Sequence, residues 1–218
     1  TNILNSYYSE VSTAISQNNG EIAKFAGDAI LACFPYRGQE AVFYMQAALE
    51  QIKCRILRLN HKFRKNFGIQ LAYHGMCAVG EFQSIIIGDP QYHLDFILRG
   101  TALTKLFAQE MPEKEGAIVF NGRFSRNVSF QASKKQTQVP STKIQNAFLP
   151  SMVRDTSRYG TFSAELRNVA ILFIHIDISR FGQRRFSKEL NLAYIHIQES
   201  VYRYEGLVNK IDFNEKGM

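Results

Sequence analysis

The two ends of this chain carry the same pattern of apolar residues, and this internal repeat is the strongest constraint on the fold. In each copy an amphipathic helix ends at a glycine, and a strand follows with a lysine four residues after that glycine. The matching positions are Leu4, Tyr8, Val11, Ile15, Gly20, Ile22 and Lys24 in the first copy, and Leu190, Tyr194, Ile197, Val201, Gly206, Val208 and Lys210 in the second. Amphipathic helices match one another easily, but the glycine-to-lysine spacing in register is more specific. We therefore expect two copies of one domain, the first without its opening strand and the second truncated at its C-terminus.

The periodicity of apolar residues predicts a mixture of helices and strands. Helical spacing predicts helices over residues 2–17, 41–67, 102–109 and 188–204. Short apolar runs bounded by turn residues predict strands over 21–25, 29–34, 69–73, 82–87, 94–98, 117–120, 168–176 and 207–213. The run at 168–176 is apolar on both faces, which is typical of a central strand.

The composition changes in the middle of the chain and predicts a linker there. Residues 131–150 contain the stretch SKKQTQVPST, which offers little to a hydrophobic core. We expect a first domain over residues 1–130, a linker over 131–163 and the start of a second domain over 164–218. The linker should be exposed and mostly irregular.

Charge and hydropathy exclude several classes of protein. The net charge is +7, and all of the excess comes from residues 121–218, where the basic side chains are scattered and not interleaved with aromatic residues. That pattern does not favour nucleic-acid binding. No apolar run reaches the ~18 residues of a membrane span. The three cysteines form no paired motif and the chain opens without a basic leader, so a cytoplasmic, reducing location is expected.

A segment of the first copy resembles the catalytic domain of class III nucleotide cyclases. Residues 20–34 read GEIAKFAGDAILACF, a strand–turn–strand segment with a Gly-Asp turn. Further similar stretches lie at residues 71–88, 95–103, 147–153, 164–173 and 204–217, so the resemblance covers nearly the whole chain. The nearest branch is the soluble, bicarbonate-responsive, tandem-domain adenylyl cyclases. This resemblance implies ferredoxin-like α+β palm domains in tandem, paired with pseudo-twofold symmetry.

The resemblance also implies a reaction and three site residues. The family converts ATP to cyclic AMP and pyrophosphate between two domains, with two Mg²⁺ or Mn²⁺ ions. Asp28 matches a metal-binding aspartate, Lys210 matches the lysine that hydrogen-bonds adenine, and Lys24 matches a lysine near the regulatory bicarbonate pocket. Without the resemblance, Gly27-Asp28 is an ordinary turn and both lysines are solvated strand residues.

A second hypothesis is a catalytically inactive cyclase-homology protein that acts as a scaffold or nucleotide-sensing module, for example in a cilium or flagellum. Glu81 stands where membrane-bound relatives place an arginine for the triphosphate, and Phe107 and Ala108 stand where an anion-binding arginine is expected. An acid at that place would repel phosphate. Four of the five histidines, at positions 61, 74, 93 and 196, show no metal-ligand spacing and are expected in helices and loops.

Overall fold

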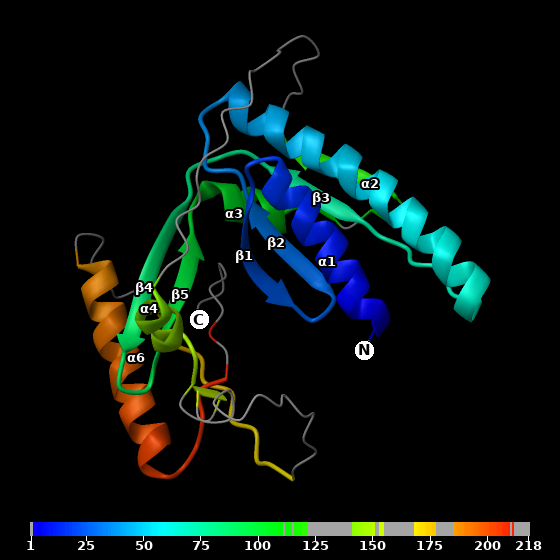
Figure 1. The fold of residues 1–218 in the computed structure, drawn as a ribbon. Helices are drawn as coiled ribbons and strands as arrows, with labels where there is room; N and C mark the ends of the chain where they lie inside the picture. The colour runs from blue at the N-terminus through cyan, green and yellow to red at the C-terminus, as the bar shows by residue number, and fades with distance from the viewer. Residues whose placement is uncertain are drawn as a thin grey trace. The chain divides into compact units, whose positions relative to one another are not determined.

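The computed structural model describes residues 2–110, 112–114, 116–121, 141–150, 153–154, 168–177, 185–209 and 211. The chain forms two compact units, and each is built from two separate stretches of sequence (Figure 1). Unit 1 takes Thr1–Val79 and Lys105–Thr137, and unit 2 takes Gly80–Thr104 and Gln138–Met218. Both units contain helices and short strands, which agrees with the predicted α+β class at this coarse level.

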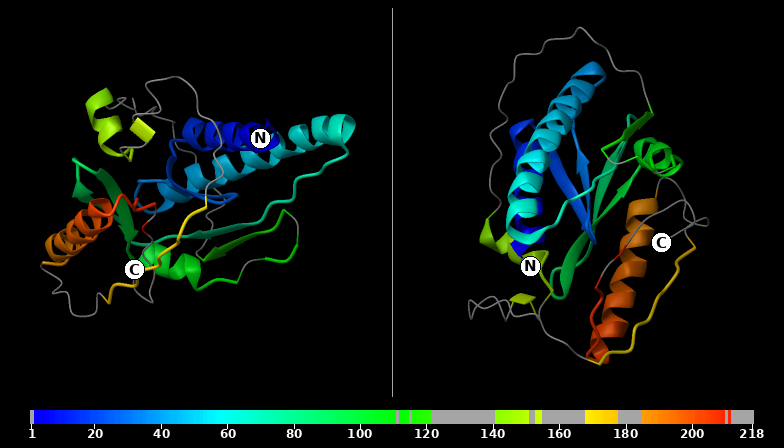
Figure 2. Two further views of the ribbon diagram at one scale, coloured as in Figure 1. Left: turned by 90° about the horizontal axis from the view of Figure 1, so that it is seen from below. Right: turned by 90° about the vertical axis from the view of Figure 1, so that its right-hand side faces the viewer.

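Unit 1 is organised around two helices and a β-hairpin. Its described elements are α1 (Asn2–Gln17), β1 (Glu21–Ala26), β2 (Ala29–Cys33), α2 (Gln39–Phe67), β3 (Gly75–Ala78) and β6 (Ile118–Asn121). Strands β1 and β2 are antiparallel, and β3 and β6 are parallel. Figure 2 shows α1 and α2 side by side.

The apolar faces of both helices form the core of unit 1. Val11 and Ile15 of α1 are buried with Ile56 of α2, and Ile22 and Ile30 of the hairpin pack against them. A second cluster joins α2 to the parallel strands and consists of Val42, Met45 and Cys77, with Ile118 and Phe120 packed against it. Helix α2 therefore covers both the hairpin and the β3–β6 pair.

Gly20 sets the tight connection between α1 and β1. Its backbone N–H donates to the Ile15 carbonyl oxygen at 2.9 Å. A Cβ atom at this position would lie 2.6 Å from the Phe34 side chain and 2.7 Å from the Ile15 side chain, so a larger residue would displace them. The predicted glycine stop of the first helix is confirmed.

Unit 2 consists of a second hairpin packed against a helix. Its elements are β4 (Gln83–Asp89), β5 (His93–Arg99), α4 (Thr142–Ala147) and α6 (Phe186–Arg203), while α3 (Thr101–Phe107) follows β5 along the chain. Strands β4 and β5 are antiparallel. The core of the unit consists of Ile85, Ile87 and Ile97 from the hairpin and Phe186, Leu190 and Tyr194 from α6.

All four predicted helices are confirmed to within a few residues, but the strand predicted at 69–73 is wrong. Residues 69–74 lie outside any strand, and β3 begins at Gly75. The reason is a side chain: Asn60 of α2 accepts a hydrogen bond from the Leu71 N–H at 2.7 Å and donates to the Leu71 carbonyl oxygen at 2.9 Å. This asparagine satisfies the backbone groups that a neighbouring strand would otherwise pair.

The central strand predicted at 168–176 is also wrong. These residues adopt no regular structure, and the side chains of Ile171 and Phe173 are 90% and 88% exposed. A strand needs a neighbour to complete its hydrogen bonds, and no described strand pairs with this segment. In the strand predicted at 207–213, residues 207–209 and 211 are irregular and the others lie outside the described residues.

The predicted linker is described only in part. Residues 131–140 lie outside the described residues, and 142–147 form the short helix α4, whose side chains are mostly exposed. The division into domains 1–130 and 164–218 stays a prediction.

Candidate functional site

The tip of the β1–β2 hairpin presents Asp28, the metal ligand that the sequence predicts. Gly27 has a φ of 62°, which favours glycine, and it forms the turn together with Asp28. The Asp28 side chain is exposed. The Tyr8 hydroxyl donates a hydrogen bond to the Gly27 carbonyl oxygen, and the Tyr8 ring packs edge-on against Phe25 at 5.3 Å. Helix α1 therefore holds the tip of the hairpin in place.

The Asp28 carboxylate also acts on the phenol next to it. Burial raises the pKa of Tyr7, and the negative charge of Asp28 raises it further. Tyr7 packs against the core of unit 1 at the same end of α1. The tip thus combines an exposed carboxylate with a half-buried phenol that stays protonated. A carboxylate in this setting can offer hard oxygen ligands to a divalent cation.

Lys24 lies on the same hairpin, beside a β-bulge. The register shifts between Ile22 and Lys24, so that Ile22 pairs with Ala32 and Lys24 with Leu31. The extra residue, Ala23, is 8% exposed, and Lys24 is half-buried. A bulge of this kind re-aims the side chains that follow it. The structure thus places Lys24 and Asp28 on one short hairpin, while Lys210, the predicted adenine ligand, lies outside the described residues.

The described residues supply one predicted metal ligand and no complete metal centre. Among them, no group of three or more His, Cys, Asp and Glu side chains is arranged to hold a metal ion. The chemistry of the Asp28 carboxylate suits Mg²⁺ or Mn²⁺, since both ions prefer oxygen ligands. Asp28 is thus suited to act as one ligand among several.

Unit 2 contains a polar cluster that the sequence analysis did not find. Its members are His93, Asp95, Tyr194 and Tyr202. The Tyr194 hydroxyl donates to Asp95 Oδ2 at 2.6 Å, and His93 Nε2 lies 3.2 Å from the same oxygen. His93 Nδ1 lies 3.1 Å from the Tyr202 hydroxyl. His93 was expected in a helix or loop, and this expectation is wrong, because it begins β5 and is 3% exposed.

Gln198 joins the polar cluster to the backbone of the hairpin. Its side chain is completely buried, donates to the His93 carbonyl oxygen at 2.8 Å and accepts from the Asp89 N–H at 3.0 Å. Asn191 accepts a further hydrogen bond from the Gly88 N–H at 2.7 Å. The sequence contains two indications of this cluster. Residues 194, 198 and 202 are spaced to share one face of a helix, and residues 93 and 95 are spaced to share one face of a strand.

Burial is the main cause of the shifted pKa values of the two tyrosines in the polar cluster. Burial raises the pKa of Tyr194, and the hydrogen bond to Asp95 raises it further. Burial also raises the pKa of Tyr202, while the Arg154 guanidinium lowers it. Arg154 in turn donates to the Gln91 and Tyr92 carbonyl oxygens. The hydrogen bonds of the cluster therefore hold α6 on the hairpin.

In the parts of the chain that the structure describes, no helix combines the length and the apolar character needed to cross a membrane.

Comparisons with known proteins give no relative of this chain. No family model matches this sequence, and no curated protein matches it significantly.

Proposed function

We propose that this chain is part of an adenylyl cyclase, which converts ATP to cyclic AMP and pyrophosphate between two cyclase domains. The proposal starts from the similarity of residues 20–34 to class III cyclases. The observation that carries it is the position of Asp28, an exposed carboxylate on a hairpin tip that α1 holds in place. The same proposal includes a cytoplasmic or ciliary location.

The residues of this chain would each contribute a separate function. Asp28 would hold Mg²⁺ or Mn²⁺, and the metal, when bound, supplies positive charge that offsets the triphosphate. A ligand on a short, fixed hairpin loses little freedom on binding, which favours a defined position. Lys210 would hydrogen-bond adenine, and Lys24 would face an anion in a regulatory pocket.

The test is cyclic AMP formation by the full-length protein that contains this chain, with Mg²⁺ or Mn²⁺ and ATP. Asp28→Asn keeps the size of the side chain but removes its charge, so we expect a loss of activity of about 100-fold or more. Glu50→Gln is the matched control, because Glu50 is an exposed carboxylate of the same unit on α2. The control should keep full activity.

Each of the other outcomes has a definite meaning. Equal activity in the wild type and Asp28→Asn would show that Asp28 is not a metal ligand. An inactive but folded wild-type protein would refute the cyclase and favour the inactive scaffold or nucleotide-sensing module. Nucleotide binding, measured by calorimetry, would then separate the sensing module from the scaffold. Lys210→Ala in an active protein should raise the KM for ATP by about tenfold, which corresponds to one lost hydrogen bond to a charged group.

A further inference from the structure

The C-terminal half of α2 exposes a cluster of basic side chains. Residues 51–80 contain no aspartate or glutamate, and the last acidic side chain before them, Glu50, marks the N-terminal limit of this cluster. The exposed basic side chains that follow are Lys53, Arg58, His61, Lys62, Arg64 and Lys65. We call these six residues the basic face of α2. It is a local feature, because residues 1–120 as a whole carry as many acidic as basic side chains.

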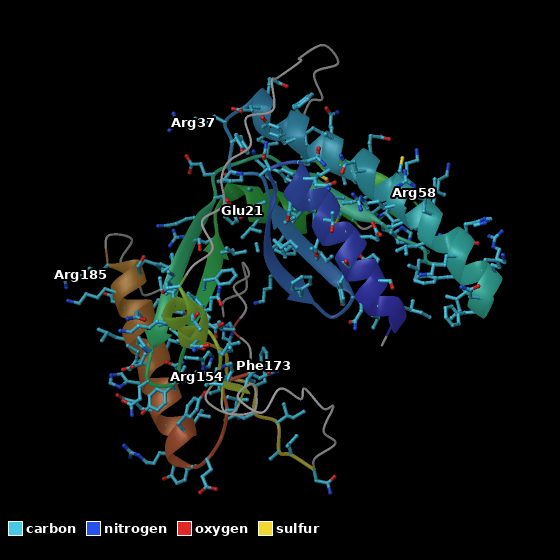
Figure 3. All side chains as sticks on the ribbon, viewed as in Figure 1. Glu21, Arg37, Arg58, Arg154, Phe173 and Arg185 are labelled. Atoms are coloured by element: carbon cyan, nitrogen blue, oxygen red, sulfur yellow. The ribbon has the colours of Figure 1, made fainter. Side chains whose placement is uncertain are left out.

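The spacing of these residues places them on one side of the helix. Lys53, His61 and Lys65 lie along one row of four-residue steps, and Arg58 and Lys62 lie along the neighbouring row. From Lys53 to Phe67 the helix extends about 21 Å. Figure 3 shows Arg58 on the exposed side of α2. The basic face is therefore separate from the core of unit 1.

The side of α2 opposite the basic face is packed in the core of unit 1, and this packing keeps the helix folded without a binding partner. Ile56, Leu59 and Phe63 are between 2% and 7% exposed and anchor α2 in unit 1. The helix is thus already formed, and binding to the basic face would require no folding. A partner would gain the full attraction of the charges.

The positive charges are not neutralised within the described structure. Arg55, which lies on the flank of the helix, pairs with Glu10 of α1, whereas Lys53, Arg58, Lys62 and Lys65 meet no carboxylate among the described residues. Like charges three or four residues apart on a helix repel one another. A negatively charged partner would relieve this repulsion. The charge pattern therefore favours binding to an anionic surface.

An apolar side chain stands among these charges. Leu57 lies between Lys53 and His61 on the same row of the helix and is 61% exposed. A helix surface that combines lysine and arginine with an exposed leucine fits peripheral binding at a membrane interface. Long basic side chains can reach lipid headgroups while apolar neighbours enter the interface. A shaped protein partner would instead favour a groove or pocket, and a single convex helix surface offers neither.

We propose that the basic face of α2 binds the surface of a membrane that contains acidic phospholipids, with Leu57 entering the interface. The binding is peripheral, and the chain stays on one side of the bilayer. Attraction between the basic side chains and acidic headgroups makes it sensitive to salt. Such binding does not require a membrane-spanning helix.

The test is the partition of the full chain into sedimented vesicles of neutral phosphatidylcholine, with or without roughly one third phosphatidylserine. We expect binding only with phosphatidylserine, and a loss of binding as salt increases. Lys62→Gln combined with Lys65→Gln should weaken the partition about 25-fold, because each basic residue near an anionic surface contributes about a factor of five. Lys143→Gln with Lys188→Gln is the matched control: both residues are exposed lysines outside α2, and the pair removes the same charge.

A second variant tests the apolar part of the proposal. Leu57→Ser should weaken the partition several-fold without changing its salt dependence, because it removes apolar contact and no charge. Circular dichroism of each variant would verify that α2 remains folded. The proposal is overturned if phosphatidylserine vesicles are not bound at low salt, or if the control pair weakens binding as much as the α2 pair. Binding to polyglutamate but not to vesicles would also overturn it and indicate an acidic protein partner.

Discussion

At the scale of single residues, Tyr194 makes a buried hydrogen bond that stabilises unit 2. Its ring is 1% exposed, and its hydroxyl donates to Asp95 Oδ2 at 2.6 Å. Tyr194→Phe removes this donor while it keeps the ring, so we expect a loss of about 1–3 kcal/mol in the free energy of unfolding at neutral pH. Urea unfolding of the full chain measures it. Tyr204→Phe is the control, because Tyr204 is 83% exposed and should change almost nothing.

The pH dependence of the same variant follows from the raised pKa of Tyr194. Burial is the main cause, with the Asp95 hydrogen bond second. Above pH about 10, the tyrosine of the unfolded chain ionises while the folded one keeps its proton, so the folded state loses stability as pH rises. The stabilisation of the folded state by the Tyr194 hydroxyl is therefore complete below pH about 10 and declines above it. The difference between wild type and Tyr194→Phe should therefore shrink above pH 10, and a growing difference would contradict the assignment.

Some of the candidate site residues could be predicted from the sequence, and others could not. The turn at Asp28 follows from a local signal, a Gly-Asp pair between two apolar strands, and the structure places it at the hairpin tip. The contacts of His93 are different in kind. Its partners include Tyr202, 109 residues away, and no local pattern brings them together. The helical spacing of Tyr194, Gln198 and Tyr202 marks a shared face but does not reveal what that face meets.

At the scale of secondary-structure elements, the docking of α6 on the β4–β5 hairpin depends on one buried amide. Gln198 pairs with the His93 carbonyl oxygen and the Asp89 N–H. Gln198→Leu has a similar volume but leaves both backbone groups unpaired in a dry interface. We expect a loss of about 2–4 kcal/mol, which is larger than for most single hydrogen bonds because two partners lose their contact.

Thermal or chemical unfolding of the full chain measures the effect of Gln198→Leu. The control is Leu192→Ala, since Leu192 is on the same helix and 48% exposed. It should cost much less than Gln198→Leu. Equal losses in the two variants would show that the amide does not hold α6 to the hairpin.

The elements themselves were largely predictable because their signals are local. Helical periodicity located α1, α2 and α6, and short apolar runs located both hairpins. The strand predicted at 69–73 failed because Asn60 captures the Leu71 backbone from another element. The strand predicted at 168–176 failed because apolar residues are necessary for a buried strand but do not supply its neighbour. In both cases the deciding partner lies elsewhere in the chain.

At the scale of the whole molecule, the path of the chain between its units could not be predicted from local signals. Residues 80–104 leave unit 1 and form the core of unit 2 with α6, and the chain then returns to unit 1. Composition marks the polar stretch after residue 130 as a boundary, but no change of composition marks residues 79 and 105. The predicted first domain, residues 1–130, therefore includes a hairpin whose apolar partner lies far beyond residue 130.

This arrangement makes the predicted domain boundary testable with fragments. In the full chain, Ile85, Ile87 and Ile97 are between 1% and 7% exposed because α6 covers them. A fragment of residues 1–130 lacks α6, and each uncovered side chain costs about 1.5–3 kcal/mol. We expect this fragment to bind a hydrophobic fluorescent dye and to give poorly dispersed amide NMR signals for residues 83–99.

A second fragment and substitutions in the first one provide the controls. Adding residues 138–218 in trans should restore the cover over the hairpin and reduce dye binding. In fragment 1–130, changing Ile85 and Ile97 to serine should also reduce dye binding, whereas Ile86→Ser should not, since Ile86 is 60% exposed even in the full chain. A fragment 1–130 that is well dispersed and free of dye would instead support an independent first domain. The hairpin would then be stable without α6, and the contacts of Gln198 would stabilise unit 2 without being needed to form it.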